Sequence, residues 1–151
     1  KSEADAIIFD LEDAVPPAKR KAARDTLGKY LSDGTFEGRQ LFIRVNELGS
    51  GDLIKDLKLI NGRQILGVVT PKIKGVSEIQ DFSNLLKKCE ERDGLPEGTV
   101  ALRQRGGALL RRAAAGQPAA LPADALYLLP CGSELAGGPL HHPAPGVRLP
   151  R

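Results

Sequence analysis

The chain alternates short apolar runs with longer amphipathic stretches three times before residue 90. The apolar runs cover residues 6–9, 41–46 and 65–70, and apolar residues recur at helical spacing after each of them. Apolar strands that alternate with helices are typical of a parallel sheet covered on both faces. The pattern therefore predicts an α/β fold of three consecutive β/α units. The expected buried strand residues are Ile7, Phe9, Phe42, Ile43, Val68 and Val69.

Two local signals predict where helices begin. Pro16 and Pro17 suit the first turn of the first helix, where a missing N–H group costs nothing. Ser77, followed three residues later by Gln80, predicts a capping box at the start of the third helix.

The pattern changes after about Val100, where Lys and Ile disappear and Arg, Ala, Leu, Pro and Gly dominate. Residues 101–107 continue no plausible strand, and repeated prolines interrupt any long element. We therefore divide the chain into an ordered part, residues 1–99, and a tail, residues 100–151, without stable packed structure. A coding sequence read in the wrong frame from near Thr99 is the favoured explanation of the tail. A genuine low-complexity tail is the alternative.

Composition narrows the class of protein. The 151 residues, 41% hydrophobic and 27% charged, fit one globular domain but are few for a complete (β/α)8 barrel of about 250 residues. The net charge is +3, and the excess positive charge lies in the tail without interleaved aromatic residues, which argues against a nucleic-acid partner. Cys89 and Cys131 match neither a disulfide framework nor a zinc site, so a reducing compartment is expected. Neither an apolar run of about 18 residues nor a signal peptide before Lys1 is present, so no membrane partner is expected.

Polar residues follow each predicted strand, where a parallel fold gathers its functional groups. Glu12 and Asp13 follow the first strand, Arg44 and Asn46 end the second, and Lys72 follows the third. An acidic pair after a strand can instead cap the next helix, and Lys72 can be a solvated strand end. Arg44 is different because a guanidinium inside an apolar strand needs a carboxylate or phosphate partner. We expect Arg44 to bind a substrate or to pair with Glu12 or Asp13.

Several segments together carry a specific resemblance to a known family. They are DAIIFDLEDAVP at residues 5–16, Lys21 with Ala23-Arg24, IRVN at residues 43–46, Asp52-Leu53 and TPKI at residues 70–73. Their order and spacing resemble the opening of citrate lyase beta subunit-like proteins of the HpcH/HpaI aldolase family, from about residue 4 to about residue 86. The resemblance implies a partial (β/α)8 TIM barrel, with about three β/α units followed by an irregular tail.

The resemblance also implies a function. Such proteins are magnesium-dependent carbon–carbon lyases, and the expected substrate is a 3-hydroxy acyl-CoA thioester such as malyl-, citramalyl- or citryl-CoA. Arg44 would bind the carboxylate of the keto-acid part in a bidentate manner. Glu12 and Asp13 would orient Arg44 or bind metal-bound water. Family members are homo-oligomers, but this chain lacks the C-terminal lid, so an oligomer is not expected for it. The expected compartment is the cytoplasm or the mitochondrial matrix.

One departure from the family pattern bears on activity. The Glu and Asp that bind Mg²⁺ in the family come from strands that should follow Val100, beginning with an Ile-Glu-Thr-like strand, and neither motif is present. We therefore assign no metal ligand in this chain and expect it to be inactive as written. Because the change of composition falls where the family places its next strand, it favours a shifted reading frame.

Two other interpretations remain open. A haloacid dehalogenase-like phosphatase also begins with a hydrophobic strand and an Asp-rich tip. That chemistry needs a second Asp two residues after the nucleophilic Asp, and Glu12 stands at this position. The second alternative is a non-catalytic barrel fragment that serves as a binding or structural module.

Overall fold

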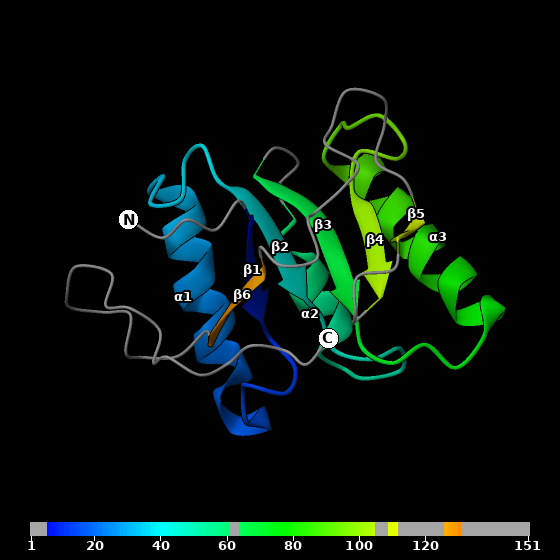
Figure 1. Cartoon of the computed structure of the whole chain (residues 1–151), viewed down its shortest axis with the longest axis horizontal. Coiled ribbons are helices and arrows are strands. Elements are labelled where there is room, and N and C mark those ends of the chain that lie inside the picture. The colour runs from blue at the N-terminus through cyan, green and yellow to red at the C-terminus, as the bar shows by residue number, and fades with distance from the viewer. Residues whose placement is uncertain (1–5, 61–63, 105–108, 112–125, 131–151) are drawn as a thin grey trace.

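The computed structural model describes residues 6–60, 64–104, 109–111 and 126–130 of the chain. Within these ranges, helices alternate with the strands of a single sheet (Figure 1). The elements are β1 (Ala6–Asp10), η1 (Pro17–Lys19), α1 (Arg20–Ser32), β2 (Gln40–Arg44), α2 (Leu53–Leu57), β3 (Ile65–Thr70), α3 (Val76–Arg92), β4 (Ala101–Gln104), β5 (Leu109–Arg111) and β6 (Leu126–Pro130).

The strands β1 to β4 lie side by side in chain order, and each pairs in parallel with the next. Ile8 lies opposite Phe42, and Phe9 lies opposite Ile43, so the strands that the apolar runs predict pair in parallel as expected. On the other side of β1, β6 adds a further parallel strand, whereas β5 pairs antiparallel with β4. Consecutive parallel strands joined by helices are the arrangement from which a (β/α)8 barrel is built, so the predicted fold class is confirmed.

The main core lies between the sheet and the helices. Phe9, Ile43, Val68 and Leu102 are neighbours across β1 to β4 and form one row of fully buried side chains. The helices pack onto this row with Ala23, Leu27 and Leu31 from α1, Leu53 and Leu57 from α2, and Phe82, Leu86 and Cys89 from α3. The six predicted strand residues are buried except Ile7, which is half-buried against this core.

A second row of side chains points to the opposite face of the sheet, which we call the inner face. It contains Ile8, Phe42, Gly67 and Ala101, which are neighbours across β1 to β4. A Cβ atom on Gly67 would lie 2.7 Å from Phe42 Cε1 and 2.9 Å from the backbone oxygen of Ala101. Gly67 therefore makes room for the Phe42 ring. Phe42 lies on the inner face two residues before Arg44, next to the polar residues at the strand ends.

The fourth strand corrects one sequence-based expectation. Ala101–Gln104 forms β4, so the prediction that residues 101–107 continue no strand is wrong for these four residues. The fully buried carboxylate of Glu90, on α3, accepts hydrogen bonds from Gly98 N at 3.0 Å and Val100 N at 2.8 Å. The chain is therefore held against α3 immediately before the strand begins.

The tail after Val100 is described only in part. The backbone of β6 pairs with β1 and that of β5 with β4. The expectation that the tail has no stable packed structure stays a prediction. The other residues of the 105–151 segment lie outside the described residues. The division of the chain at residue 99 and the shifted reading frame stay predictions.

The starts of the helices agree with the sequence signals in one of two cases. Pro17 opens η1, which leads directly into α1, as the proline pair predicts. The third helix begins at Val76, with Gly75 as its N-cap and no capping hydrogen bond from a side chain. The capping box predicted at Ser77 and Gln80 is therefore wrong, because Glu78 Oε2 accepts the Lys74 N–H at 2.8 Å instead.

Replacing Gly67 by Ala tests the close approach of Phe42. We expect Gly67→Ala to lower the free energy of unfolding by about 1–3 kcal/mol, because the added methyl group overpacks the inner face. Urea denaturation of both proteins measures this difference. Gly28→Ala is the control, because its Cβ would lie 3.7 Å from Leu59 Cδ2 in ordinary contact, and alanine favours the helix. Equal stability of Gly67→Ala and the parent would show that Phe42 and the neighbouring backbone can shift to accept the methyl group.

Candidate functional site

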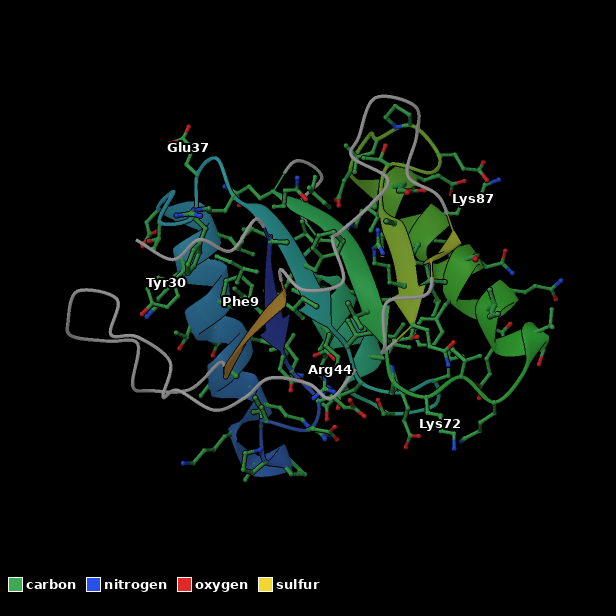
Figure 2. All side chains as sticks on the ribbon, in the orientation of Figure 1. Phe9, Tyr30, Glu37, Arg44, Lys72 and Lys87 are labelled. Carbon is green, nitrogen blue, oxygen red and sulfur yellow. The ribbon has the colours of Figure 1, made fainter. Side chains whose placement is uncertain are left out.

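The inner face carries a charged row at the carboxyl ends of the strands. This row contains Asp10, Arg44, Val69 and Arg103, which are neighbours across β1 to β4. It lies two residues further along each strand than the row that contains Phe42. Because the strands are parallel, their carboxyl ends meet at one edge of the sheet, and Arg44 lies there (Figure 2). Strand register thus brings together groups that are far apart in the sequence.

Arg44 is bound on one edge of its guanidinium by Asp10. Arg44 Nε donates to Asp10 Oδ1 at 2.9 Å, and Nη2 donates to Asp10 Oδ2. Both residues are buried, with 4% of Arg44 and 2% of Asp10 exposed. Burial opposes the positive charge, but the hydrogen bonds that Arg44 donates to Asp10 and the charges of Asp10, Glu12 and Asp13 more than offset it and raise the pKa of Arg44. The guanidinium is a permanent cation in a bidentate pair.

The two predicted acidic residues stand close to the same guanidinium. Glu12 Oε2 lies 3.4 Å from Arg44 Nε, and Asp13 Oδ2 lies 3.3 Å from Arg44 Nη2. The predicted pairing of Arg44 with Glu12 and Asp13 is thus present, although Asp10 is the nearer partner. One guanidinium and three carboxylates give this cluster a formal net charge of −2.

Asp10 also shapes the loop that carries the other two carboxylates. Its Oδ1 accepts the Glu12 N–H at 2.9 Å, and its Oδ2 accepts the Ala14 N–H at 3.2 Å. Asp10 was not predicted from the sequence as a partner of Arg44. The signal that could have found it is strand period: Asp10 lies two residues after Ile8 and therefore points to the same face.

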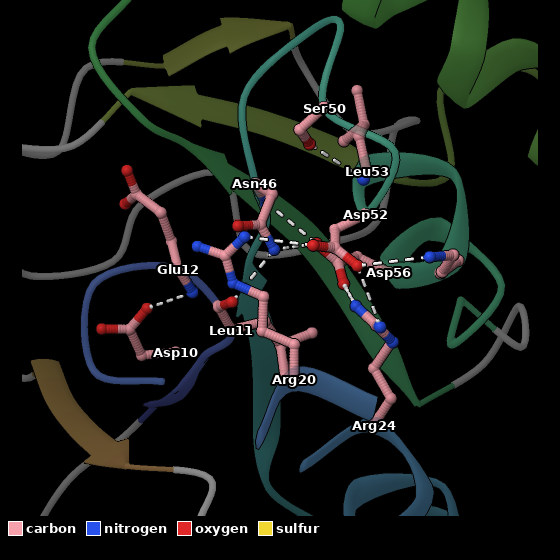
Figure 3. A network of polar contacts seen from close by, with 11 residues as sticks. Asp10, Leu11, Glu12, Arg20, Arg24, Asn46, Ser50, Asp52, Leu53 and Asp56 are labelled. Atoms are coloured by element: carbon pink, nitrogen blue, oxygen red, sulfur yellow. Dashed lines mark hydrogen bonds and ion pairs between the residues drawn. The ribbon is translucent and has the colours of Figure 1, made fainter. Parts of the chain in front are cut away.

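Asn46, a weaker candidate from the sequence, lies in a buried polar network next to this loop (Figure 3). Its backbone N–H and its Nδ2 both donate to Asp56 Oδ2, at 2.9 and 2.7 Å, and Nδ2 also donates to the Leu11 carbonyl at 3.0 Å. The other oxygen of Asp56 accepts a hydrogen bond from Arg24 Nη1 on α1 at 2.8 Å. The sequence did not identify Asp56, because it lies on a helix whose local pattern shows only an acidic residue.

A second carboxylate on the same segment extends the contacts with α1. Asp52 Oδ2 accepts from Arg20 Nη1 and Asp52 Oδ1 from Arg24 Nη2, both at 3.0 Å. The hydrogen bond from Arg20 comes first among the causes that lower the pKa of Asp52, partial burial opposes it, and Arg24 and Lys55 add to it. Asp52 therefore stays ionised between two arginines on the outer side of the site.

The remaining basic residues near the strand ends differ in their surroundings. Lys72 follows β3 with an exposed side chain, so the structure gives it no distinct role. Arg103 is buried on the inner face, with its guanidinium carbon 5.9 Å from the centre of the Phe42 ring, and burial lowers its pKa. Arg103 was missed because the sequence analysis placed no strand at this position.

The described residues do not fit a magnesium ion. No group of three or more His, Cys, Asp or Glu side chains within the described ranges has an arrangement that holds a metal. The one acidic cluster, Asp10 with Glu12 and Asp13, surrounds the guanidinium of Arg44, whose charge repels a second cation. In the same part of the chain, no helix is long and apolar enough to cross a membrane.

Fold and site together define a barrel-type α/β protein with an arginine and carboxylate cluster at the carboxyl ends of its strands. The sequence model of the HpcH/HpaI aldolase/citrate lyase family matches residues 1–105, and the chain belongs to this family. Parallel β1 to β4 with a polar cluster at the strand ends agree with that assignment.

Individual relatives are similar over part of their length. Citrate lyase subunit beta of Leuconostoc mesenteroides subsp. cremoris is 30% identical over 97 residues, which are 64% of this chain and 32% of that protein. The (3S)-malyl-CoA thioesterase of Cereibacter sphaeroides is 34% identical over 83 residues, 55% of this chain and 29% of that one. The chain therefore spans about a third of the length of these relatives.

A solved structure supports the fold. Malate synthase of Haloferax volcanii in a magnesium/glyoxylate complex superimposes with a TM-score of 0.58 at 20% identity. The matched region covers 70% of this chain and 34% of the malate synthase chain.

Substitutions of two acidic residues test which carboxylate neutralises Arg44. We expect Asp10→Asn to lower the free energy of unfolding by about 3–5 kcal/mol, because it leaves a buried guanidinium without its bidentate partner. Asp13→Asn should change it by less than about 0.5 kcal/mol, because the Asp13 side chain is 53% exposed. Urea denaturation at neutral pH measures both. Equal effects of the two substitutions would contradict the dominance of Asp10.

Asp52 should make stability depend on pH in the acid range. Its pKa in the folded protein lies below the ordinary value of 3.8, so its stabilisation is complete above that value and is lost as the pH falls through the folded pKa. The difference in unfolding free energy between the parent and Asp52→Asn should therefore be largest above about pH 5 and shrink below about pH 4. Denaturation series across this range measure it. A difference that stays constant with pH would show that Arg20 and Arg24 do not stabilise the charged form.

Proposed function

We propose that this chain is part of a carbon–carbon lyase that cleaves or condenses a 3-hydroxy acyl-CoA thioester of the malyl, citramalyl or citryl type. The names of its relatives support this substrate class, since one is a citrate lyase subunit and another acts on malyl-CoA. The observation that carries the proposal is the buried guanidinium of Arg44 at the carboxyl ends of the strands, oriented by three carboxylates.

The geometry of Arg44 leaves a recognisable binding edge. Within the described part of the chain, its hydrogen bonds to Asp10 use Nε and Nη2, which form one side of the planar fork. The other side, formed by Nη1 and the second proton of Nη2, donates no hydrogen bond to Asp10, and the half-exposed Asp13 carboxylate lies 3.3 Å from Nη2. A carboxylate binds such an edge through two parallel hydrogen bonds. We propose that the carboxylate of the keto-acid part of the substrate binds there.

Glu12 and Asp13 complete the proposed site. Both stand within 3.4 Å of Arg44, and both are more exposed than Asp10, with side chains 21% and 53% exposed. They are therefore in a position to orient Arg44 and to hold water beside a bound substrate.

Magnesium enters the proposal only at the level of the family. The malate synthase with a similar fold was solved with magnesium and glyoxylate. A divalent cation in such an enzyme polarises a carbonyl group and stabilises the enolate that forms when the carbon–carbon bond breaks. Because the described residues do not fit this ion, we assign it no ligand and attribute to Arg44, Glu12 and Asp13 only binding and orientation.

A phosphatase of the haloacid dehalogenase type is not supported by the site. Its chemistry would need Asp10 as a free nucleophile. Asp10 instead binds Arg44 with both oxygens and accepts two backbone N–H groups of the following loop. A carboxylate held by four donors is a structural anion. The match to another family over residues 1–105 points the same way.

Binding of malyl-CoA by the 151-residue chain tests the role of Arg44. We expect Arg44→Lys to weaken binding roughly ten- to a hundredfold, about 1.5–3 kcal/mol, because an ammonium group cannot bind a carboxylate in a bidentate manner. Arg44→Ala should weaken it further. Isothermal titration calorimetry measures the affinity.

Circular dichroism serves as the control that each variant is folded. If a folded Arg44→Ala variant binds malyl-CoA as tightly as the parent, Arg44 is only the structural partner of Asp10. If the parent itself binds neither malyl-CoA nor citramalyl-CoA, the chain is a non-catalytic fragment and the proposed function is wrong for it.

A further inference from the structure

We propose that Asn46 and Asp56 form a positioning relay that holds the loop of residues 10–14 against Arg44. This inference rests on the proposed function only in that the loop borders the proposed substrate site. The relay itself follows from the hydrogen bonds of two buried side chains, neither of which touches the substrate edge of Arg44.

Asp56 is a fixed point on α2. It is 0% exposed, and both of its carboxylate oxygens accept hydrogen bonds. Oδ2 accepts the backbone N–H and the Nδ2 of Asn46 at 2.9 and 2.7 Å, and Oδ1 accepts Arg24 Nη1 at 2.8 Å. A fully buried carboxylate is tolerated only with such partners, and the same partners leave it a single orientation.

Asn46 transmits this orientation to the loop after β1. Its Nδ2 donates to Asp56 Oδ2 and to the carbonyl of Leu11, which lies between Asp10 and Glu12. Both neighbours are acceptors, so only an NH₂ group can satisfy them together, and this explains why an amide rather than a carboxylate stands at position 46. The Leu11 N–H donates to the Arg44 carbonyl at 2.9 Å, so the backbone of Leu11 is bound at both ends to the β2 segment.

The acidic loop is held at Leu11 and also by Asp10, whose carboxylate accepts the Glu12 and Ala14 N–H groups. Glu12 and Asp13 follow directly after it, and their contacts with Arg44, at 3.4 and 3.3 Å, are longer than a normal charge-assisted hydrogen bond. Contacts of this length do not fix a loop by themselves. The Leu11 carbonyl, bound by Asn46, and the Asp10 carboxylate therefore together keep the two carboxylates beside the guanidinium.

Asp52 provides a matched control for Asp56. The two residues lie on the same segment, and each binds Arg24. Asp52 binds Arg20 and Lys55 in addition, but its contacts do not include Asn46. Loss of Asp52 thus removes ion pairs between α1 and the α2 segment and leaves the relay intact, whereas loss of Asp56 removes the relay.

Amide hydrogen exchange in the full 151-residue chain tests the relay. We expect Asp56→Ala to speed exchange of the Glu12 and Ala14 amides at least about tenfold relative to the Ile43 amide of β2, because the loop opens without the strand. Asp52→Ala should leave that ratio within about twofold of the parent. If Asp56→Ala fails to fold, Asp56→Asn and Asn46→Ala replace it. Asp56→Asn keeps one acceptor oxygen, so it should restore part of the protection of the loop.

Two outcomes would overturn the relay. Equal acceleration of loop amide exchange in Asp52→Ala and Asp56→Ala would show that Asp56 affects the loop only through the stability of the whole fold. An unchanged ratio of loop to Ile43 exchange rates in Asp56→Ala would show that the loop keeps its position without Asp56. The exchange needs no ligand, so a failure of the lyase proposal does not affect it. Titration with malyl-CoA separates the two: a change in loop exchange without a change in affinity supports the relay and contradicts the placing of substrate beside Glu12 and Asp13.

Discussion

The structure depends on keeping one positive charge inside a sheet. Arg44 is almost fully buried, and an unpaired guanidinium in such surroundings would cost several kcal/mol. Asp10 supplies the bidentate partner from the neighbouring strand, and the loop after Asp10 brings two further carboxylates. Each of these groups is placed by parallel register, so an error of one residue in the pairing of β1 with β2 would send Arg44 and Asp10 to opposite faces.

The sheet and the polar site share one set of constraints. On the face covered by helices, the row of Phe9, Ile43 and Val68 fixes the register by burial. On the inner face, the missing side chain of Gly67 leaves the space that the Phe42 ring occupies, and Arg103 of the charged row lies 5.9 Å from the centre of that ring. The core therefore selects the register, and the register in turn assembles the cluster around Arg44.

The sequence predicted the features that follow from local pattern. Apolar runs in the sequence predict the strands β1 to β3, and Arg44 was identified because its charge interrupts one of these runs. Glu12 and Asp13 were placed correctly near Arg44, since carboxyl ends of parallel strands meet. Asp10 and Asp56 were not predicted as partners, because their roles come from residues 34 and 10 positions away in the chain. The roles of Arg44, Glu12 and Asp13 in catalysis remain predictions.

The strand β4 was missed for a reason that the structure makes clear. Its residues include Arg103 and Gln104, which have no marked preference for a strand, and its start is determined by Glu90 on the preceding helix. The carboxylate holds the backbone at Gly98 and Val100, so the chain reaches the edge of β3 at a fixed position, and the buried Leu102 side chain then packs into the core. The position of the fourth strand thus depends on a residue of the preceding helix α3. A single carboxylate on one helix therefore determines where the backbone of the next strand begins, before any side chain of that strand makes a contact.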